Sequence, residues 1–242
     1  MTELIIEEQE SPFKKGVQAG LSIAIGYAPV ALTFGLLAKT TGLTMGEAML
    51  MSIIVFAGAA QYISLSLIAL GTSAFEIILT TFIVNIRHFL MSTALNEKAE
   101  DDSLLYKAIY SFSITDESFS VVATREGVLK TGFILGVNLI GYFSWVIFTG
   151  VGFVIGANLP ETLQESMSVA LYAMFIGLLV PSMKKGVKVI YLAALAAIIN
   201  TIFTYAELLS TGWAIVVATL LSAILVEFVE SIKQSKGDNH EQ

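Results

Sequence analysis

Three polar side chains lie close together in an otherwise apolar stretch of the chain. Asn85, Arg87 and His88 place an amide, a guanidinium and an imidazole within the run FIVNIRHFLM. These groups can bind a carboxylate, donate hydrogen bonds to a polar solute and exchange a proton near neutral pH. A charged side chain at the centre of a membrane helix costs about 2.5–3.5 kcal/mol, so residues of this kind usually mark a substrate or ion pathway.

Two acidic residues form a second ionisable group further along the chain. Asp116 and Glu117 are adjacent in the middle of the segment 107–125. A buried carboxylate is hard to ionise, so it can take up a proton or bind a cation. We predict that Asp116, Glu117 and His88 are the groups available for proton coupling.

Helical spacing divides the first group between two faces. Asn85 and His88 lie three residues apart and share a face, whereas Arg87 points about 100° away from His88. Two arrangements are therefore open. In the preferred one, Asn85, His88 and Ser92 line the pathway. Arg87 then pairs with one of the two acids, Asp116 or Glu117. In the other, Arg87 binds a substrate carboxylate and the acids bind its ammonium group.

The composition indicates that these residues belong to a membrane protein. Hydrophobic residues make up 55% of the 242 and charged residues only 14%, whereas globular chains carry about 25% charged residues. Uncharged runs long enough to cross a hydrocarbon core of about 30 Å recur along the chain. They cover residues 16–38, 48–75, 131–160, 166–183, 189–206 and 208–226.

Two further segments complete the predicted fold, an all-α polytopic helical bundle with about eight membrane segments. Segment 76–96 inserts despite Arg87, but 107–125 spans poorly because two acids cost about 5–7 kcal/mol. We nevertheless predict that 107–125 crosses, or reaches across as a re-entrant segment. Eight crossings place nine lysines and arginines on the side of a cytoplasmic amino terminus. Both termini are then cytoplasmic, and three lysines lie outside: Lys39, Lys98 and Lys107.

The chain is predicted to be one transport domain over residues 16–230, between polar cytoplasmic segments at 1–15 and 231–242. Three pairs of glycines with GxxxG spacing predict close helix packing within this domain. The pairs are Gly16 and Gly20, Gly132 and Gly136, and Gly152 and Gly156.

Two positions favour a broken membrane helix. Pro29 removes a backbone hydrogen bond within the first span, where it gives either a break or a simple kink. Gly58 begins a run of small residues that ends at Gln61. Unwound backbone within a membrane is tolerated where it lines a cavity, and the half-helix ends there bind ions and charged substrate groups. We predict at least one broken helix, with Pro29, Gly58 and Gln61 near the substrate.

Several classes of function fit this sequence poorly. It has no cysteine, no HExxH motif and one histidine within a predicted span, so we expect no metal site, no cofactor and no enzymatic activity. It has no GxxxxGK[ST] loop for nucleotide-driven transport. The net charge of −7 lies mostly in ends and loops and indicates no nucleic-acid partner. A secondary transporter fits best; the alternatives are a passive channel and a non-transporting assembly subunit.

Five short blocks, in this order, resemble the AzlC family, the large subunits of bacterial branched-chain amino acid exporters. The blocks read GYAP, FAGAAQ, NIRHFLMS, TDE and FIGLLVP. The resemblance runs from about residue 16 to the last span. It implies export of valine, leucine and isoleucine, with methionine as a further candidate, driven by the proton motive force across the bacterial inner membrane. It also implies a small membrane subunit of the AzlD type as a partner.

The polar residues suit such a substrate. A branched-chain amino acid is a zwitterion, so its carrier needs a partner for the carboxylate, a partner for the ammonium group and an aliphatic pocket. Arg87, or the amino end of a helix broken near Pro29 or Gly58, can bind the carboxylate. Asp116 or Glu117 can bind the ammonium group. Apolar walls are available from Phe56, Phe82, Phe89, Leu90 and Phe112.

Overall fold

The computed structural model describes residues 11–156, 186–238 and seven isolated positions between these ranges, with side chains described as far as residue 231. The secondary structure in this part of the chain is helical, apart from one isolated bridge between Ala99 and Leu129. Five of its helices are long and apolar enough to cross a membrane. An all-α membrane protein is therefore confirmed, but the count of about eight segments is not. The span predicted at 166–183 and the tail residue His240 lie outside the described residues.

The chain folds as two compact units. The first contains Met1–Gln61 and Asn85–Met167, and the second contains Tyr62–Val84 and Ser168–Gln242. The division into one transport domain with polar ends stays a prediction. Helix α1 already begins at Pro12, and helix α10 continues to Asp238.

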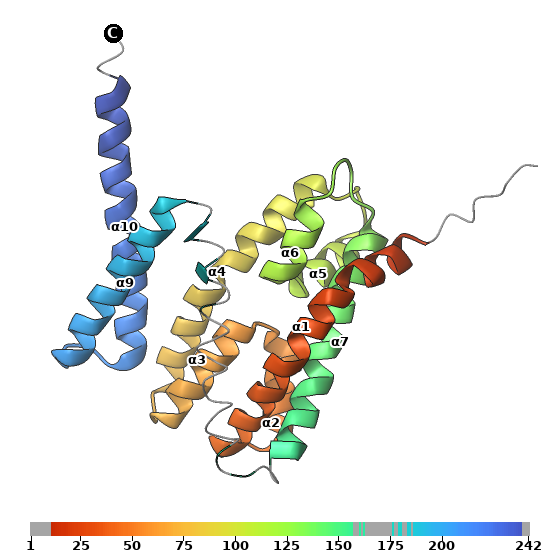
Figure 1. Ribbon diagram of the computed structural model, residues 1–242, viewed down its shortest axis with the longest axis horizontal. Helices are drawn as coiled ribbons and strands as arrows, with labels where there is room; N and C mark the ends of the chain where they lie inside the picture. The colour runs from red at the N-terminus through yellow and green to blue at the C-terminus, as the bar shows by residue number, and fades with distance from the viewer. Residues whose placement is uncertain are drawn as a thin grey trace, which may run out of the picture. The chain divides into compact units, whose positions relative to one another are not determined.

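Two long helices, α1 (Pro12–Thr40) and α7 (Thr131–Gly156), lie side by side in the first unit (red and green in Figure 1). Their backbones approach closely at glycines. A Cβ at Gly16 would lie 2.2 Å from the carbonyl oxygen of Phe133, and one at Gly35 would lie 2.0 Å from that of Thr149. The amino-terminal part of α1 contacts the amino-terminal part of α7, and the two carboxy-terminal parts also contact each other, so the helices are parallel. The predicted packing role of the glycines is confirmed here.

Replacing Gly35 with alanine is expected to destabilise the first unit by about 1–3 kcal/mol, because the new methyl group meets backbone that cannot move aside. Gly26→Ala is the matched control on the same helix, since a Cβ there meets nothing within 4 Å. Alanine should even favour the helix at that position. Thermal unfolding in detergent measures both. Equal melting temperatures for the two variants would contradict the close approach of α1 and α7.

Helix α1 continues through Pro29, so of the two possibilities left open at this position, a break or a simple kink, the break is excluded. Proline removes one backbone hydrogen bond, but neighbouring hydroxyls bind carbonyls on either side of the gap. Ser144 donates to the Ala24 carbonyl at 2.6 Å, and Thr33 donates to the Pro29 carbonyl at 2.9 Å. With α7 packed along its length, α1 tolerates the loss.

The predicted broken helix occurs instead directly before Gly58. Helix α2 (Met45–Leu50) continues as the π-helix η1 (Met51–Val55), and helix α3 (Gly58–Ala69) follows. Between them Phe56 adopts a left-handed conformation with φ of 40°. The chain reverses direction here. The evidence is a hydrogen bond between side chains nine residues apart, in which the Gln61 amide nitrogen donates to the Ser52 hydroxyl at 3.1 Å. The uncharged run 48–75 therefore contains a hairpin, the first hairpin, with its tip at Phe56 and Ala57, and not one spanning helix.

A second hairpin follows helix α4 (Ala74–Lys98) and consists of α5 (Leu104–Phe112) and α6 (Asp116–Ala123). The first residue of α6, Asp116, pairs with Arg87 in α4. Its last residue, Ala123, accepts a hydrogen bond from Lys98 at the end of α4, at 2.7 Å. The chain therefore returns to the end from which it entered, and the predicted crossing of 107–125 is wrong. Helices of nine and eight residues are only about 12–14 Å long, too short for the core.

This reversal changes the side on which two lysines lie. The loop after α4 is at the amino end of α7, because the Glu100 carboxylate accepts the Thr131 N–H at 2.9 Å. We call this the basic end of the first unit. It holds Lys98 and Lys107, which the prediction placed with Lys39. Lys39 instead lies over the ring of Phe153 near the other end of α7. The basic end carries Lys14, Lys15, Lys98, Lys107, Arg125 and Lys130.

The Glu100 carboxylate should make the basic end sensitive to acid. A hydrogen bond from Lys130 at 2.7 Å, together with the Thr131 N–H, holds the Glu100 pKa below its ordinary value. The contact therefore stabilises the fold above that ordinary pKa and is lost as pH falls through the lowered one. Because 29% of the Glu100 side chain is exposed to solvent, the effect is small. The protection factor of the Thr131 N–H against hydrogen exchange should therefore fall at acid pH. Glu100→Gln should remove this pH dependence, and an unchanged profile would contradict the contact.

The second unit pairs helix α9 (Val187–Tyr205) with α10 (Thr211–Asp238). A buried acid holds the start of α10: Glu76 in α4 is 6% exposed and accepts hydrogen bonds from the Ser210 hydroxyl and the Trp213 N–H. The helix dipole favours a carboxylate there. At the other end Lys188 forms ion pairs with Glu227 at 2.7 Å and Glu230 at 2.5 Å.

Candidate functional site

The tips of the two hairpins meet at one aromatic residue of α7. The ring of Tyr142 lies 5.0 Å from that of Phe56 at the first tip and 6.2 Å from that of Phe112 beside the second. Its hydroxyl also donates to the Ile53 carbonyl at 3.0 Å. The first hairpin enters from the end opposite the basic end, where Met49 packs against Gly150. The two tips thus approach the middle of α7 from opposite ends.

The second tip places two acids at the start of a helix. Thr115 and Ser118 form a capping box, in which each side chain binds the other's backbone N–H, at 3.2 and 2.9 Å. Asp116 and Glu117 occupy the first turn of α6, where the helix dipole stabilises negative charge. Threonine followed by two acids is a sequence that begins a helix. This explains why the chain restarts a helix here instead of continuing α5.

The two adjacent acids face different partners. Asp116 pairs with Arg87 at 2.8 Å, and each of the two side chains is 36% exposed. Glu117 instead accepts a hydrogen bond from the hydroxyl of Tyr27 in α1, at 2.5 Å. The ion pair expected in the preferred arrangement is therefore present between α4 and α6. Glu117 has no cationic partner among the described residues.

Tyr27 is the residue that sequence reasoning missed. Its hydroxyl also lies 2.7 Å from the Thr115 hydroxyl, and its ring meets that of Trp145 edge-on at 5.4 Å. Trp145 in turn packs on Gly58, where a Cβ would lie 2.8 Å from the indole ring. Tyr27 and Trp145 therefore connect the acids of the second tip with the first tip. The only signal in the sequence was a tyrosine two residues before Pro29, in the middle of an apolar span.

The first tip carries no negative charge. Helix α3 has no acid in its first turn and begins with Gly58, so none of its first backbone N–H groups is matched by a carboxylate of the helix itself, and the helix dipole there favours an anion. Gln61 is fully buried, and its side-chain oxygen has no hydrogen-bond partner within the described residues. The indole N–H of Trp145, which is 4% exposed, also has none there. These groups add unused polar atoms around the amino end of α3.

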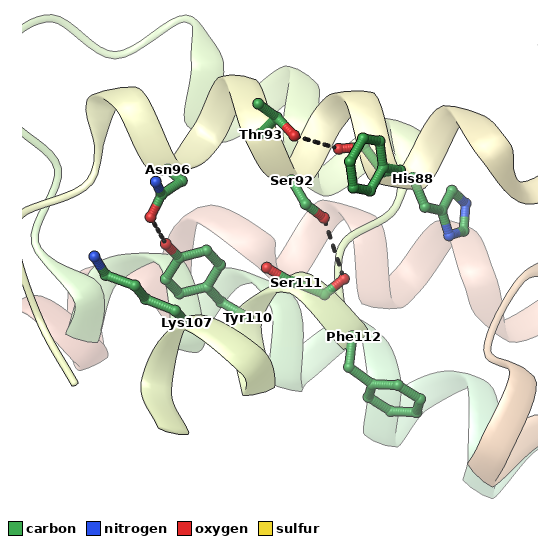
Figure 2. Close-up of a pocket in the computed structure, with 9 residues that line it drawn as sticks. His88, Ser92, Thr93, Asn96, Lys107, Tyr110, Ser111 and Phe112 are labelled. Atoms are coloured by element: carbon green, nitrogen blue, oxygen red, sulfur yellow. Dashed lines mark hydrogen bonds between the residues drawn. The ribbon is translucent and has the colours of Figure 1, made fainter. Parts of the chain in front are cut away.

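The remaining predicted site residues lie at different places. His88 lines a groove between α4 and α5, on the face of α4 that also carries Ser92 (Figure 2). Asn85 does not line this groove, and its side-chain oxygen is buried without a partner in the described part of the chain. Pro29 stays within the continuous helix α1. The fold thus brings Arg87, Asp116 and Glu117 together, but not Pro29.

Comparison with known proteins gives a consistent family. The profile described as "AzlC protein" matches residues 22–159. An uncharacterised membrane protein of Archaeoglobus fulgidus is 33% identical over 71% of this chain and 76% of its own length. The inner membrane protein YgaZ of Escherichia coli is 28% identical over 89% of this chain and 91% of its own.

A relative with a transport name is more distant. The branched-chain amino acid transport protein AzlC of Bacillus subtilis is 22% identical over 73% of this chain and 70% of its own length. No solved structure matches the chain. The matched profile covers α1 from residue 22 onward, both hairpins and α7, so it includes every residue of the candidate site described above.

Proposed function

This chain belongs to the AzlC family of membrane transport proteins, and we propose that it exports branched-chain amino acids in exchange for protons. Valine, leucine and isoleucine are the proposed substrates, with methionine as a further candidate. The name of the Bacillus subtilis relative supports this substrate class. The proposed partner is a small membrane subunit of the AzlD type, and the proposed location is the cytoplasmic membrane.

The observation that carries the proposal is the opposite charge preference of the two hairpin tips. The acid-free amino end of α3 offers N–H groups to a carboxylate, and Glu117 at the amino end of α6 offers a carboxylate to an ammonium group. A zwitterion needs both. The rings of Phe56, Phe112 and Tyr142 stand between the tips and provide apolar surface for an aliphatic side chain.

Competition at Glu117 can couple the two fluxes. A carboxylate binds either a proton or a substrate ammonium group, because protonation removes the negative charge that attracts the cation. In such a carrier, Glu117 must release its proton before it binds the substrate, and must release the substrate before it binds a proton. The amino acid and the proton therefore move in opposite directions. The Tyr27 hydroxyl donates a hydrogen bond to the Glu117 carboxylate and so holds it in position for the substrate. His88, nearby on α4, is the second candidate for a proton-carrying group.

The charge distribution supports an orientation for the first unit. The basic end carries six lysines and arginines, and Lys39 lies at the other end. Cytoplasmic loops of membrane proteins carry an excess of lysine and arginine. We therefore place the basic end, including the amino end of α1, in the cytoplasm. The second hairpin then enters from the cytoplasm and the first from the outside.

Counterflow of labelled valine in proteoliposomes tests the proposal. The protein, reconstituted with and without the small subunit, should concentrate labelled valine against an internal pool of unlabelled valine. An imposed pH gradient should drive net movement of valine opposite to the protons. Movement without counterflow or gradient coupling would indicate a passive channel. No movement of any aliphatic amino acid, even with the small subunit, would contradict transport by this chain.

A further inference from the structure

A groove of about 540 Å³ lies between α4 and α5 and ends at His88; polar side chains line it together with the rings of Phe89 and Phe112 (Figure 2). We propose that it is a water-filled vestibule through which a small zwitterionic amino acid reaches the site from the basic end. This inference rests on the proposed function, because it assigns an entrance to the same site.

The polar residues of the groove form a row on one helix face. His88, Ser92 and Asn96 are spaced four residues apart on α4, so they lie above one another. Figure 2 shows Ser92 and Asn96 pointing toward α5. There the Tyr110 hydroxyl donates to the side-chain oxygen of Asn96 at 3.1 Å. The Ser92 hydroxyl donates to the backbone carbonyl of Ser111 at 3.5 Å. Polar groups therefore lie on both walls of the groove, one formed by α4 and the other by α5.

The groove has the length and position of an entrance. From Asn96 to His88 it follows α4 for about 12 Å, at 1.5 Å per residue. At its outer end Lys107 pairs with Asp101 in the loop of the basic end, at 3.0 Å. Its inner end is at His88, the residue next to Arg87, whose ion pair with Asp116 joins α4 to the second tip. The groove therefore leads from the loops of the basic end to the helix turn beside the site.

Solvation favours water over lipid in this space. The side chains of Ser92, Asn96 and Tyr110 already have one partner each across the groove, and water can bind their remaining donor and acceptor positions in a polar cavity with enough room. At about 30 Å³ per molecule, the groove holds roughly 18 waters. A small amino acid displaces only some of them. The Lys107–Asp101 pair at the mouth presents both charges that a zwitterion can bind.

The absence of cysteine from the chain makes the test direct. Single substitutions Ser92→Cys and Ser111→Cys place a thiol in the groove. Leu90→Cys is the matched control, because Leu90 lies on the same helix outside the groove and is 65% exposed. Each variant is treated with a membrane-impermeant, charged thiosulfonate in sealed vesicles of either orientation. Monodispersity in detergent shows that each variant is folded.

We expect both groove thiols to react at least about tenfold faster than Leu90→Cys, because only a hydrated thiol ionises to the reactive thiolate. The reagent should act from the side of the 99–103 loop. Reaction at the control rate, or from the opposite side alone, would overturn the vestibule. Excess valine should slow the reaction of Ser92→Cys, whereas excess glutamate should not. Fast labelling without valine protection would overturn the assignment of an amino acid to a groove that still holds water.

The two proposals can fail separately. Labelling in the absence of substrate reports on water in the groove and needs no transport. Valine counterflow with slow labelling would support export and overturn this entrance. Fast labelling in a protein that moves no amino acid would support a hydrated groove and contradict the proposed function.

Discussion

Replacing Arg87 with methionine is expected to destabilise the first unit by about 2–3 kcal/mol. Removing one member of a buried ion pair costs about 3–5 kcal/mol, because the other charge is left without a partner. The value here is lower since both side chains are 36% exposed. Asp116 sits at the start of α6, so its uncompensated charge should weaken the docking of the second hairpin on α4. Thermal unfolding in detergent, and insertion of the segment 107–125, measure this effect.

The double variant Arg87→Met, Asp116→Leu separates the two roles open for Arg87. If the ion pair is structural, removing both charges should restore most of the lost stability, because neither partner is left charged and alone. If Arg87 mainly binds the substrate carboxylate, Arg87→Met should weaken valine binding without lowering the melting temperature. Unchanged stability and insertion in Arg87→Met would therefore contradict the structural pair.

Replacing Glu117 with glutamine is expected to abolish export driven by a pH gradient and to weaken valine binding by about 10–100-fold. A hydrogen bond to a charged group contributes about 1.5–3 kcal/mol, and the amide keeps the shape of the side chain but loses its charge and its exchangeable proton. Valine efflux down its own gradient is compared at several pH values, and its pH dependence should flatten in the variant. Transport assays and calorimetric titration with valine measure the two effects.

Two further variants provide the controls for Glu117. Glu126→Gln removes an acid from an exposed position in the loop before α7 and should leave transport unchanged. Tyr27→Phe keeps the ring that packs on Trp145 but removes the hydroxyl that donates to Glu117. It should shift the pH dependence of transport with a smaller loss of activity. Gradient-driven export by Glu117→Gln at the normal rate would remove this residue from the coupling step.

The helical, membrane-spanning character of the chain could be predicted from run length and apolar content, but the hairpins could not. An uncharged run of spanning length predicts a crossing whether the chain goes straight or turns back. The reversal at Phe56 depends on a left-handed conformation that a bulky residue rarely adopts. Gly58 was the only local signal. The missed reversal of 107–125 placed Lys98 and Lys107 at the wrong end of the first unit.

The part of the candidate site that depends on charge compensation could be predicted from the sequence. An ion pair between Arg87 and one of the two acids was the preferred arrangement from the sequence, and the structure identifies Asp116 as that acid. Tyr27 was not predictable, because a tyrosine in an apolar helix is usually part of the packing. Its contact with Glu117 depends on the docking of α6 against α1. The separation of the adjacent acids Asp116 and Glu117 toward different helices also required the tertiary structure.

Binding of valine and its two half-analogues tests the central claim most directly. Isovalerate keeps the carboxylate and side chain but lacks the ammonium group; isobutylamine keeps the amine and side chain but lacks the carboxylate. If the amino end of α3 binds the carboxylate and Glu117 binds the ammonium group, valine should bind the purified protein at least about tenfold more tightly than either analogue. Glu117→Gln should remove the advantage over isovalerate. An analogue that binds as tightly as valine would contradict recognition of a zwitterion between the two hairpin tips.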